Sequence, residues 1–279
     1  MDLPGGGPIV GPVFAGPLHF RLDPPAPGAR NMAVDEALMV GARHGRVTLR
    51  LYRWDPPCLS FGRNQRARDR YDLEAARARG IEVVRRPTGG RAVFHHRELT
   101  YSVTAPAGLW GGLRASYLRI NRALLRGLAS LGAPVAEAGR RSGERSPAPT
   151  TRACFRDPLP GEITAAGRKL VGSAQWRDGG ALLQHGSLLL HDDQDTAERL
   201  RLGTGARRGS GDGTGVRAAA LADLLDRVPD PAELAAALRV GFSEELGVEV
   251  RDAPPDEPDP GLVDRLEARY RDPAWTWRR

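Results

Sequence analysis

The order of strand-like and helix-like segments restricts the fold of this chain more than any other feature. Segments that alternate like strands come in runs, and segments with helical spacing lie between those runs and after them. This order is typical of the α+β class, and no segment repeats along the chain. We therefore predict an α+β fold with a mixed, largely antiparallel sheet packed with helices, and the length of 279 residues allows one large domain or two small ones.

Individual elements follow from local patterns. Asn31 is a good N-cap residue, so we expect a helix to begin there. Asp178-Gly179-Gly180 predicts a tight hairpin turn. Two polar stretches without a hydrophobic period, residues 139–152 and 203–215, are predicted to be mobile loops. The expected strands are 13–22, 47–54, 58–62, 81–85, 92–95, 98–104, 161–164, 170–175 and 181–190, and the other expected helices are 71–79, 114–131, 218–225, 231–246 and 262–270.

The charge of the chain indicates an acidic partner. The formal net charge is +7 and the isoelectric point is about 10.2. The arginines are scattered, and the sequence contains no zinc-finger spacing, RRM-like aromatic signature or dense basic arm. A nucleic acid is the usual partner of such a charge, and these absences make an acidic protein at least as good a candidate, although some of this charge would serve solubility alone.

Several classes of protein are disfavoured by what the sequence lacks. Its first residues show no secretory pattern, and no apolar run approaches the ~18 residues of a membrane span. Its two cysteines make no disulfide framework, so we expect a cytoplasmic protein without a membrane partner. No His, Cys and carboxylate spacing predicts a metal site.

The basic residues are unusual because Lys169 is the only lysine among 41 Lys and Arg residues. A surface charge tolerates replacement of Lys by Arg, but a lysine that exchanges a proton does not. The single lysine is therefore a candidate catalytic residue, although a surface lysine retained by chance would give the same composition.

Cys154 lies fifteen residues before Lys169 and follows a polar loop. A nearby ammonium favours the reactive thiolate, so this pair could supply a nucleophile with its proton partner. An inert buried thiol is the alternative. Cys58 lies within a strand-like run, and we interpret it as a packing residue.

Two further segments could contact a ligand. The first contains Arg85, Arg86, Thr88, the pair Gly89-Gly90 and His95. Adjacent glycines let the backbone approach a ligand closely, although a plain hairpin would use them too. The second contains His185 followed by Gly186, where a structural histidine in a strand is the commoner case.

Four stretches together resemble the lipoate–protein ligase and octanoyltransferase family, whose fold is that of biotin/lipoate-protein ligase catalytic domains. They appear in the order of that family and lie within residues 10–190. The most specific pieces are Arg-Arg-Pro-Thr-Gly-Gly and Lys-x-x-Gly-Ser-Ala-Gln. The four stretches are 31–38, 54–65, 85–95 with 99–102, and 167–175 with 183–188.

Two details resemble the octanoyltransferase branch that is typical of Gram-positive bacteria. Arg91 stands where ATP-dependent ligases usually have a third glycine, and Cys154-Phe-Arg-Asp-Pro158 precedes the lysine. Two positions depart from the pattern: His96 replaces an acidic residue, and Pro160-Gly161 replaces an aromatic pair. No motif covers the helical portion at 218–279.

The resemblance implies a single catalytic domain, residues 1–279, that transfers an octanoyl group from octanoyl-acyl carrier protein, through a cysteine thioester, to a lysine of a lipoyl-type domain. Cys154 would be the nucleophile and Lys169 its acid/base partner. The implied substrate-binding residues are Arg85, Arg86, Thr88, Gly89, Gly90, Val93, His95, Gly172, Ser173, Ala174, His185 and Gly186.

No metal and no cofactor would be required, because the thioester donor is already activated. The acceptor would be a protein such as glycine cleavage H protein or a 2-oxoacid dehydrogenase E2 subunit. Three alternatives stay open: an ATP-dependent lipoate ligase, an amidotransferase that moves octanoyl or lipoyl groups between carriers, and a non-catalytic acyl-protein binding module.

Overall fold

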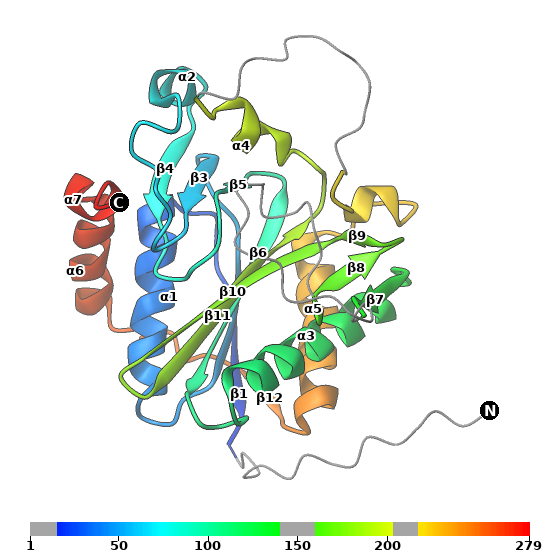
Figure 1. Ribbon diagram of the computed structural model, residues 1–279. Helices are drawn as coiled ribbons and strands as arrows, with labels where there is room; N and C mark the ends of the chain where they lie inside the picture. Colours follow the sequence, from blue (N-terminus) through cyan, green and yellow to red (C-terminus); the bar gives the residue numbers. More distant parts are fainter. Residues whose placement is uncertain (1–15, 140–159, 203–216) are drawn as a thin grey trace.

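A six-stranded mixed sheet forms the centre of the molecule, as the computed structural model shows for residues 16–139, 160–202 and 217–279 (Figure 1). The strand order is β10-β11-β6-β2-β1-β12. Strands β10, β11, β6 and β2 pair antiparallel, whereas β1 pairs parallel with both β2 and β12. The strands are β1 (Leu18–Leu22), β2 (Thr48–Tyr52), β6 (Glu98–Pro106), β10 (Val171–Asp178), β11 (Ala181–Leu189) and β12 (Val250–Asp252).

This sheet confirms the predicted α+β class. The predicted hairpin at Asp178 is also present, since β10 and β11 pair directly across it. Gly179 and Gly180 adopt φ angles of +53° and +81°, which side chains with a Cβ rarely adopt. The turn therefore depends on its two glycines.

One face of the sheet is apolar and packs on two helices. Leu49, Leu51 and Val103 are fully buried on this face. They contribute to the same core as apolar residues of α3 (Leu113–Ser130) and α5 (Pro231–Leu246). The amphipathic pattern of these helices explains why they cover this face.

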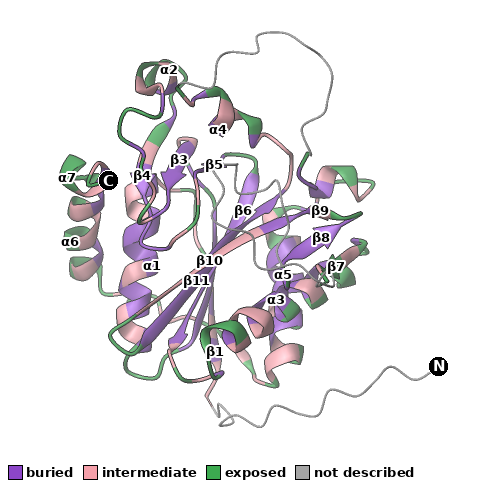
Figure 2. Cartoon of the chain, viewed as in Figure 1, coloured by how far each residue is buried: buried purple, intermediate pink, exposed green. Residues whose placement is uncertain are grey.

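The opposite face of the sheet is polar but equally buried. Arg50, Ser102 and His185 point to this side, because they alternate with the apolar residues of the same strands. Helix α1 (Gly28–Ala42) covers the face, and α6 (Pro260–Arg271) packs outside α1 (Figure 1). In Figure 2, α1 and the central strands are largely coloured as buried. A buried polar layer thus lies between α1 and the sheet.

Smaller elements flank the sheet. One three-stranded sheet has the order β4-β3-β5, and another has the order β7-β8-β9. Their strands are β3 (Cys58–Phe61), β4 (Glu82–Arg85), β5 (Val93–His95), β7 (Val135–Glu137), β8 (Ile163–Ala165) and β9 (Arg168–Lys169). The remaining helices are α2 (Leu73–Ala78), α4 (Asp195–Arg199) and α7 (Pro273–Thr276). Cys58 is fully buried, which confirms its interpretation as a packing residue.

Two local predictions were wrong. Asn31 is not an N-cap, because α1 begins at Gly28; its amide instead donates to the carbonyls of Ala26 and Arg53, at 3.0 Å each. The expected helix at 218–225 is only a 3₁₀ turn at Leu221–Asp223. The residues before that turn are extended, and the Ala219 N–H donates to the Lys169 carbonyl. In both places a tertiary hydrogen bond overrides the local preference.

Cys154, residues 140–152 of the first predicted mobile loop and all of the second lie outside the described residues. Within the described ranges, no helix is both long and apolar enough to cross a bilayer. The same ranges hold no group of three His, Cys, Asp or Glu residues that could bind a metal ion.

Candidate active site

A pocket lies on the polar side of the central sheet, between its strands and the β4-β3-β5 sheet. Its empty space, including the open mouth, is about 420 Å³. The wall combines apolar and aromatic side chains with a few converging polar groups. It is formed by Met32, Tyr52, Trp54, Ser60, Arg86, Gly90, Val93, His95, Thr100, Gly172, Ser173, Ala174, His185, Gly186 and Ser187.

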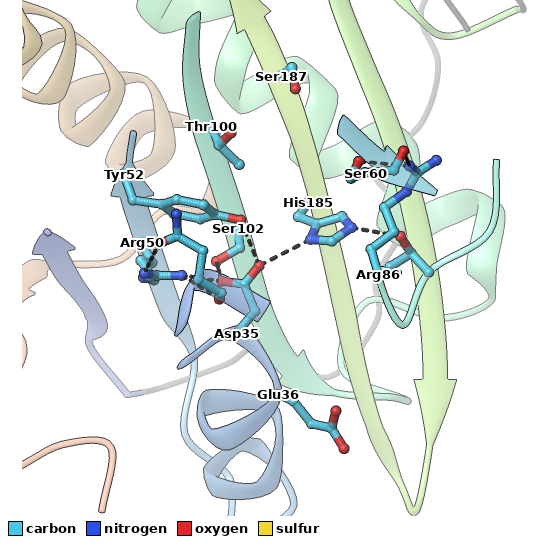
Figure 3. A network of polar contacts seen from close by, with 12 residues as sticks. Asp35, Glu36, Arg50, Tyr52, Ser60, Arg86, Thr100, Ser102, His185 and Ser187 are labelled. Carbon is cyan, nitrogen blue, oxygen red and sulfur yellow. Dashed lines mark hydrogen bonds and ion pairs between the residues drawn. The ribbon is translucent and has the colours of Figure 1, made fainter. Parts of the chain in front are cut away.

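Asp35 is the centre of the buried polar layer behind this pocket (Figure 3). Its carboxylate accepts hydrogen bonds from Arg50 Nη1 at 2.7 Å, Ser102 Oγ at 2.7 Å and Tyr52 OH at 2.9 Å. Burial alone would raise the pKa of Asp35. The charge of Arg50 and the hydrogen bond from His185 outweigh burial and hold that pKa below its ordinary value. Asp35 is therefore ionised.

Arg50 balances this charge from strand β2, where 1% of its side chain is exposed. Besides Asp35, its guanidinium contacts Asp23 Oδ2 at 2.6 Å and Asn31 Oδ1 at 2.9 Å. A planar five-donor fork can serve several acceptors at once, which a lysine could not do in this geometry. Asn31, the mispredicted cap, thus belongs to the network behind the pocket.

His185 connects the Asp35 network to the Gly-Gly turn. Its Nδ1 lies 3.0 Å from Asp35 Oδ2, and its Nε2 lies 2.6 Å from Thr88 Oγ1. A carboxylate only accepts hydrogen bonds, so Nδ1 carries a proton, and Nε2 shares the second hydrogen bond with the Thr88 hydroxyl. Through His185, helix α1 therefore holds the residue that opens the turn at Gly89-Gly90.

Arg86 shapes the same turn from the other side. It donates to the carbonyls of Gly89 at 2.9 Å and Ser60 at 3.1 Å, and to Ser60 Oγ at 3.0 Å. Gly90 has a φ of +92°, and a Cβ built on Gly62 would lie 2.0 Å from the Gly90 carbonyl oxygen. The turn thus passes directly over the backbone of Gly62, which leaves no room for side chains at this contact.

His95 forms part of the pocket wall together with Trp54. The two rings stack with centroids 4.0 Å apart, and His95 Nε2 lies 2.8 Å from Ser60 Oγ. Burial, together with Arg86 and His185, places the pKa of His95 well below its ordinary value. The ring is therefore neutral near pH 7.

Glu98 lies behind His95, with Oε1 3.3 Å from Nδ1 of the ring and 2.6 Å from the Thr100 hydroxyl that donates to it. Burial raises the pKa of Glu98 to about 8. The His95 and Glu98 side chains thus add no net charge to this part of the wall at pH 7. An apolar ligand can therefore lie against this part of the wall without separating an ion pair.

Strands β10 and β11 bring the remaining predicted binding residues together. Gly172, Ser173, Ala174 and Gly186 all line the pocket, and Ser173 pairs with Gly186 across the two strands. A Cβ on Gly186 would lie 2.4 Å from the Gly172 carbonyl oxygen. The small residues of this segment therefore let the two strands approach closely beside the pocket.

Three predicted binding residues are not in the pocket lining. Thr88 and Gly89 act behind the wall, through His185 and Arg86. Arg85 is fully buried elsewhere, where it donates to the carbonyls of Thr276 at 2.7 Å and Gly62 at 2.6 Å. Arg85 therefore joins the end of the chain to the backbone at Gly62, and it does not line the pocket.

Lys169 lies on strand β9, outside the pocket lining, with 4% of its side chain exposed. Its Nζ donates to Glu162 Oε1 at 2.7 Å. The sole lysine is therefore buried and ion-paired, unlike a random surface residue. The predicted nucleophile, Cys154, lies outside the described residues, so the two remain a predicted pair.

A model of the lipoyl protein ligase A/B catalytic domain matches residues 27–243, which include every residue that lines the pocket. The chain belongs to this family. It is 41% identical over 266 residues to octanoyltransferase LipM of Kyrpidia tusciae, covering 90% of this chain and 95% of that relative. It is 32% identical over 265 residues to octanoyltransferase LipM of Staphylococcus aureus, covering 89% and 94%.

Solved structures of the family have the same fold. A putative lipoate protein ligase from T. acidophilum superposes with a TM-score of 0.74 at 25% identity, covering 95% of this chain and 100% of that one. Lipoate-protein ligase A bound with ATP gives a TM-score of 0.75 at 25% identity, covering 94% and 99%. The resemblance found in the sequence is therefore confirmed at the level of family and fold.

Sequence reasoning missed several residues of this family member's site. Tyr52, Trp54 and Thr100 line the pocket, and Asp35 and Arg50 hold it from behind. The available signal was chemical: Asp35 follows three apolar residues in a helical stretch, and Arg50 lies in a strand between two leucines. A carboxylate and a guanidinium in two segments that are expected to be buried predict an ion pair. Only the fold shows that Asp35 and Arg50 meet.

Proposed function

We propose that this chain transfers an octanoyl group from the thioester of octanoyl-acyl carrier protein, through a thioester on Cys154, to a lysine of a lipoyl-type domain. The main support is its similarity to octanoyltransferase LipM of Kyrpidia tusciae, at 41% identity over 95% of that relative. The ATP-dependent ligase is the second candidate, because a related structure is described as a lipoate-protein ligase bound with ATP. An amidotransferase would share the proposed mechanism.

The pocket suits an uncharged acyl chain. Met32, Trp54 and Val93 supply apolar surface, and His95 adds no charge at neutral pH. Burying an apolar chain there stabilises the complex by about 0.8 kcal/mol for each methylene removed from water. Asp35 and Arg50 lie behind this surface, and Arg86 and His185, which line the pocket, hydrogen-bond the Gly-Gly turn and its neighbour Thr88.

The chemistry balances without ATP. The Cys154 thiolate attacks the thioester carbonyl, and the carrier thiol leaves with a proton. The acceptor amine then attacks the new thioester, loses a proton, and releases the Cys154 thiol as the amide forms. Lys169, paired with Glu162, is the proposed group that moves these protons.

The proposed acceptors are lipoyl-type domains such as glycine cleavage H protein or a 2-oxoacid dehydrogenase E2 subunit. A related structure is described as a bipartite lipoate protein ligase and its E2 lipoyl domain from T. acidophilum, with a TM-score of 0.70 at 26% identity. We keep the expectation that the reaction takes place in the cytoplasm and that neither nucleic acid nor membrane takes part.

The acyl-enzyme is the direct test of this proposal. Incubated with octanoyl-acyl carrier protein in the absence of ATP, the protein should gain the mass of one octanoyl group, labile to hydroxylamine and located on Cys154. Cys58→Ser is the matched control and should still be acylated, because Cys58 is fully buried and burial raises the pKa of its thiol. Acylation that persists in Cys154→Ser, or that requires ATP, would contradict the proposal.

The same assay tests Lys169. Lys169→Arg keeps the positive charge beside Glu162 but removes the compact, exchangeable ammonium. Transfer from the acyl-enzyme to a lipoyl domain should then fall by ~10²-fold or more, the usual scale for losing a positioned acid or base. Near-normal transfer would show that Lys169 supplies only charge.

A further inference from the structure

Six arginines belong to two segments that meet in the fold, residues 63–70 and 278–279, and none of them has a carboxylate partner among the described residues. We call them the arginine surface: Arg63, Arg66, Arg68, Arg70, Arg278 and Arg279. In the described parts of the chain, none of the six forms an ion pair, whereas other exposed arginines such as Arg126 and Arg251 do. Asp69 is the only acidic residue within 62–70. Within the described ranges, these six guanidinium groups are therefore not paired with carboxylate side chains.

Two distant segments meet to form the arginine surface. The Arg278 guanidinium donates to the Arg63 carbonyl at 3.1 Å, and the Arg68 N–H donates to a main-chain oxygen of Arg279 at 3.4 Å. Arg85 joins the same segments from inside through the carbonyls of Thr276 and Gly62. Figure 1 shows the end of the chain and α7 beside β4 and β3. In the sequence, the segments 63–70 and 278–279 are separated by more than two hundred positions.

The close approach of these arginines has an electrostatic cost. Burial lowers the pKa of Arg278, and the neighbouring charges of Arg63 and Arg279 lower it further. Burial lowers the pKa of Arg85 to about 10, again with contributions from Arg278 and Arg279. Repulsion between these like charges destabilises the folded protein when no partner is bound. A docked anionic partner would relieve this repulsion.

The arginine surface borders the pocket. The Arg63 N–H donates to the Thr88 carbonyl at 2.7 Å, directly beside the Gly62–Gly90 contact, and Gly90 lines the pocket. The Arg63 guanidinium also lies 4.9 Å from the ring centroid of Trp176, on the strand that contributes Ala174 to the wall. A partner on this surface would therefore stand next to the Gly-Gly turn.

We propose that the arginine surface docks the acidic carrier protein that delivers the acyl group. This inference rests on the proposed function and adds the location and chemistry of the donor contact. Arginine forks bind carboxylates and phosphates in a bidentate way. The donor offers both, because its acyl chain is tethered to an acidic protein through a phosphodiester. The acceptor offers carboxylates only, so the observations favour the donor.

A double charge reversal tests the proposal. Arg66 and Arg68 are exposed and hold no side-chain partner in the described residues, so Arg66→Glu/Arg68→Glu should fold normally. Arg114→Glu/Arg265→Glu is the matched control, with the same change of charge at two exposed arginines outside this surface. Acylation of Cys154 is measured with two donors, octanoyl-acyl carrier protein and the small neutral thioester octanoyl-N-acetylcysteamine.

We expect the reversal to lower kcat/KM for the carrier donor by ~10-fold or more while leaving the small donor unchanged, because electrostatic docking acts on association. The control should behave like wild type with both donors. Equal loss with both donors would show a structural defect and overturn the proposal. So would a normal rate with the carrier.

Two further outcomes would assign the surface to another partner and overturn the proposal. One is a defect confined to transfer from the acyl-enzyme to a lipoyl domain. The other is tight binding of wild type to duplex DNA that the reversal abolishes. If wild type accepts octanoyl from neither donor, the proposed function itself fails, and this inference fails with it.

Discussion

At the scale of single residues, the pocket is held by a buried charge pair. Asp35 and Arg50 are joined at 2.7 Å in the layer between α1 and the sheet, and the exposed fractions of their side chains are 0% and 1%. Two ions removed from water stabilise a fold only when their remaining hydrogen bonds are satisfied. Here Ser102, Tyr52 and Asn31 satisfy them. The same network positions His185, so stability and pocket shape depend on one set of contacts.

Asp35→Asn tests this dependence. The substitution leaves the Arg50 charge buried without its main partner, so the free energy of unfolding should fall by about 3–5 kcal/mol. Urea denaturation at neutral pH measures the loss. The control is Asp178→Asn, whose side chain is 56% exposed in its pair with Arg43 and which should change stability by less than about 1 kcal/mol. Equal stability of the two variants would contradict the role given to Asp35.

The stability that Asp35 contributes also depends on pH. Its pKa in the folded protein lies below the ordinary value of 3.8, so its contribution is fully present above that value and is lost as the pH falls through the folded pKa. Glu98 acts in the opposite direction. Its folded pKa of about 8 favours the protonated form, so its contribution is present below 4.5 and is lost as the pH rises through about 8.

At the scale of elements, two glycines determine how closely α3 and α5 cross. A Cβ on Gly241 of α5 would lie 2.4 Å from both the Ala123 carbonyl oxygen and the Gly127 nitrogen of α3. Both are backbone atoms and cannot rotate away. The helices therefore approach backbone to backbone over the apolar face of the sheet, and a larger residue would push them apart.

Gly241→Ala should therefore destabilise the protein, although alanine is normally favoured over glycine in a helix by about 1 kcal/mol. Overpacking against the α3 backbone should outweigh this gain and lower the free energy of unfolding by about 1–3 kcal/mol. In α6, Gly261→Ala is the control, since its Cβ would meet nothing closer than 3.5 Å. Thermal unfolding compares the two variants. A Gly241→Ala protein as stable as wild type would show that the crossing can widen freely.

At the scale of the whole molecule, charge and shape are organised around the pocket. The buried polar layer supports the wall of the pocket, and the arginine surface lies at the border of the pocket. The main core lies on the apolar face of the sheet. The net charge of +7 is thus concentrated partly where a carrier protein would approach. Much of the remaining arginine charge is balanced by carboxylates in ion pairs.

The rate of acylation by octanoyl-acyl carrier protein should accordingly fall steeply with salt. Exposed charges are screened within ~10 Å at 0.1 M ionic strength, so steering of an acidic carrier weakens. Acylation rates from quenched reactions, measured from low to moderate salt, give the dependence of the rate on salt. The neutral donor octanoyl-N-acetylcysteamine should show no such dependence. A flat response with the carrier would mean that the charge of this protein has no part in association.

Some features of the protein follow from neighbouring residues alone. Helix α5 spans the predicted residues, because Asp230 and Glu233 form a capping box at its start and Gly247 ends it in the left-handed conformation. The hairpin at Asp178 follows in the same way from two adjacent glycines. The family motifs also lie in short contiguous stretches, so family, fold class and the pocket-lining glycines Gly90, Gly172 and Gly186 were within reach of the sequence.

Other features depend on contacts between distant segments, and only the tertiary structure decided them. Asn31 is a helix-interior residue because its amide meets Ala26 and Arg53. Arg85 and Arg86 are adjacent in sequence, yet one joins the end of the chain to the Gly62 turn and the other shapes the pocket. Local patterns specify capping and turns because these involve a few neighbouring groups. The partner of a buried charge is instead selected by which strands and helices the fold brings together.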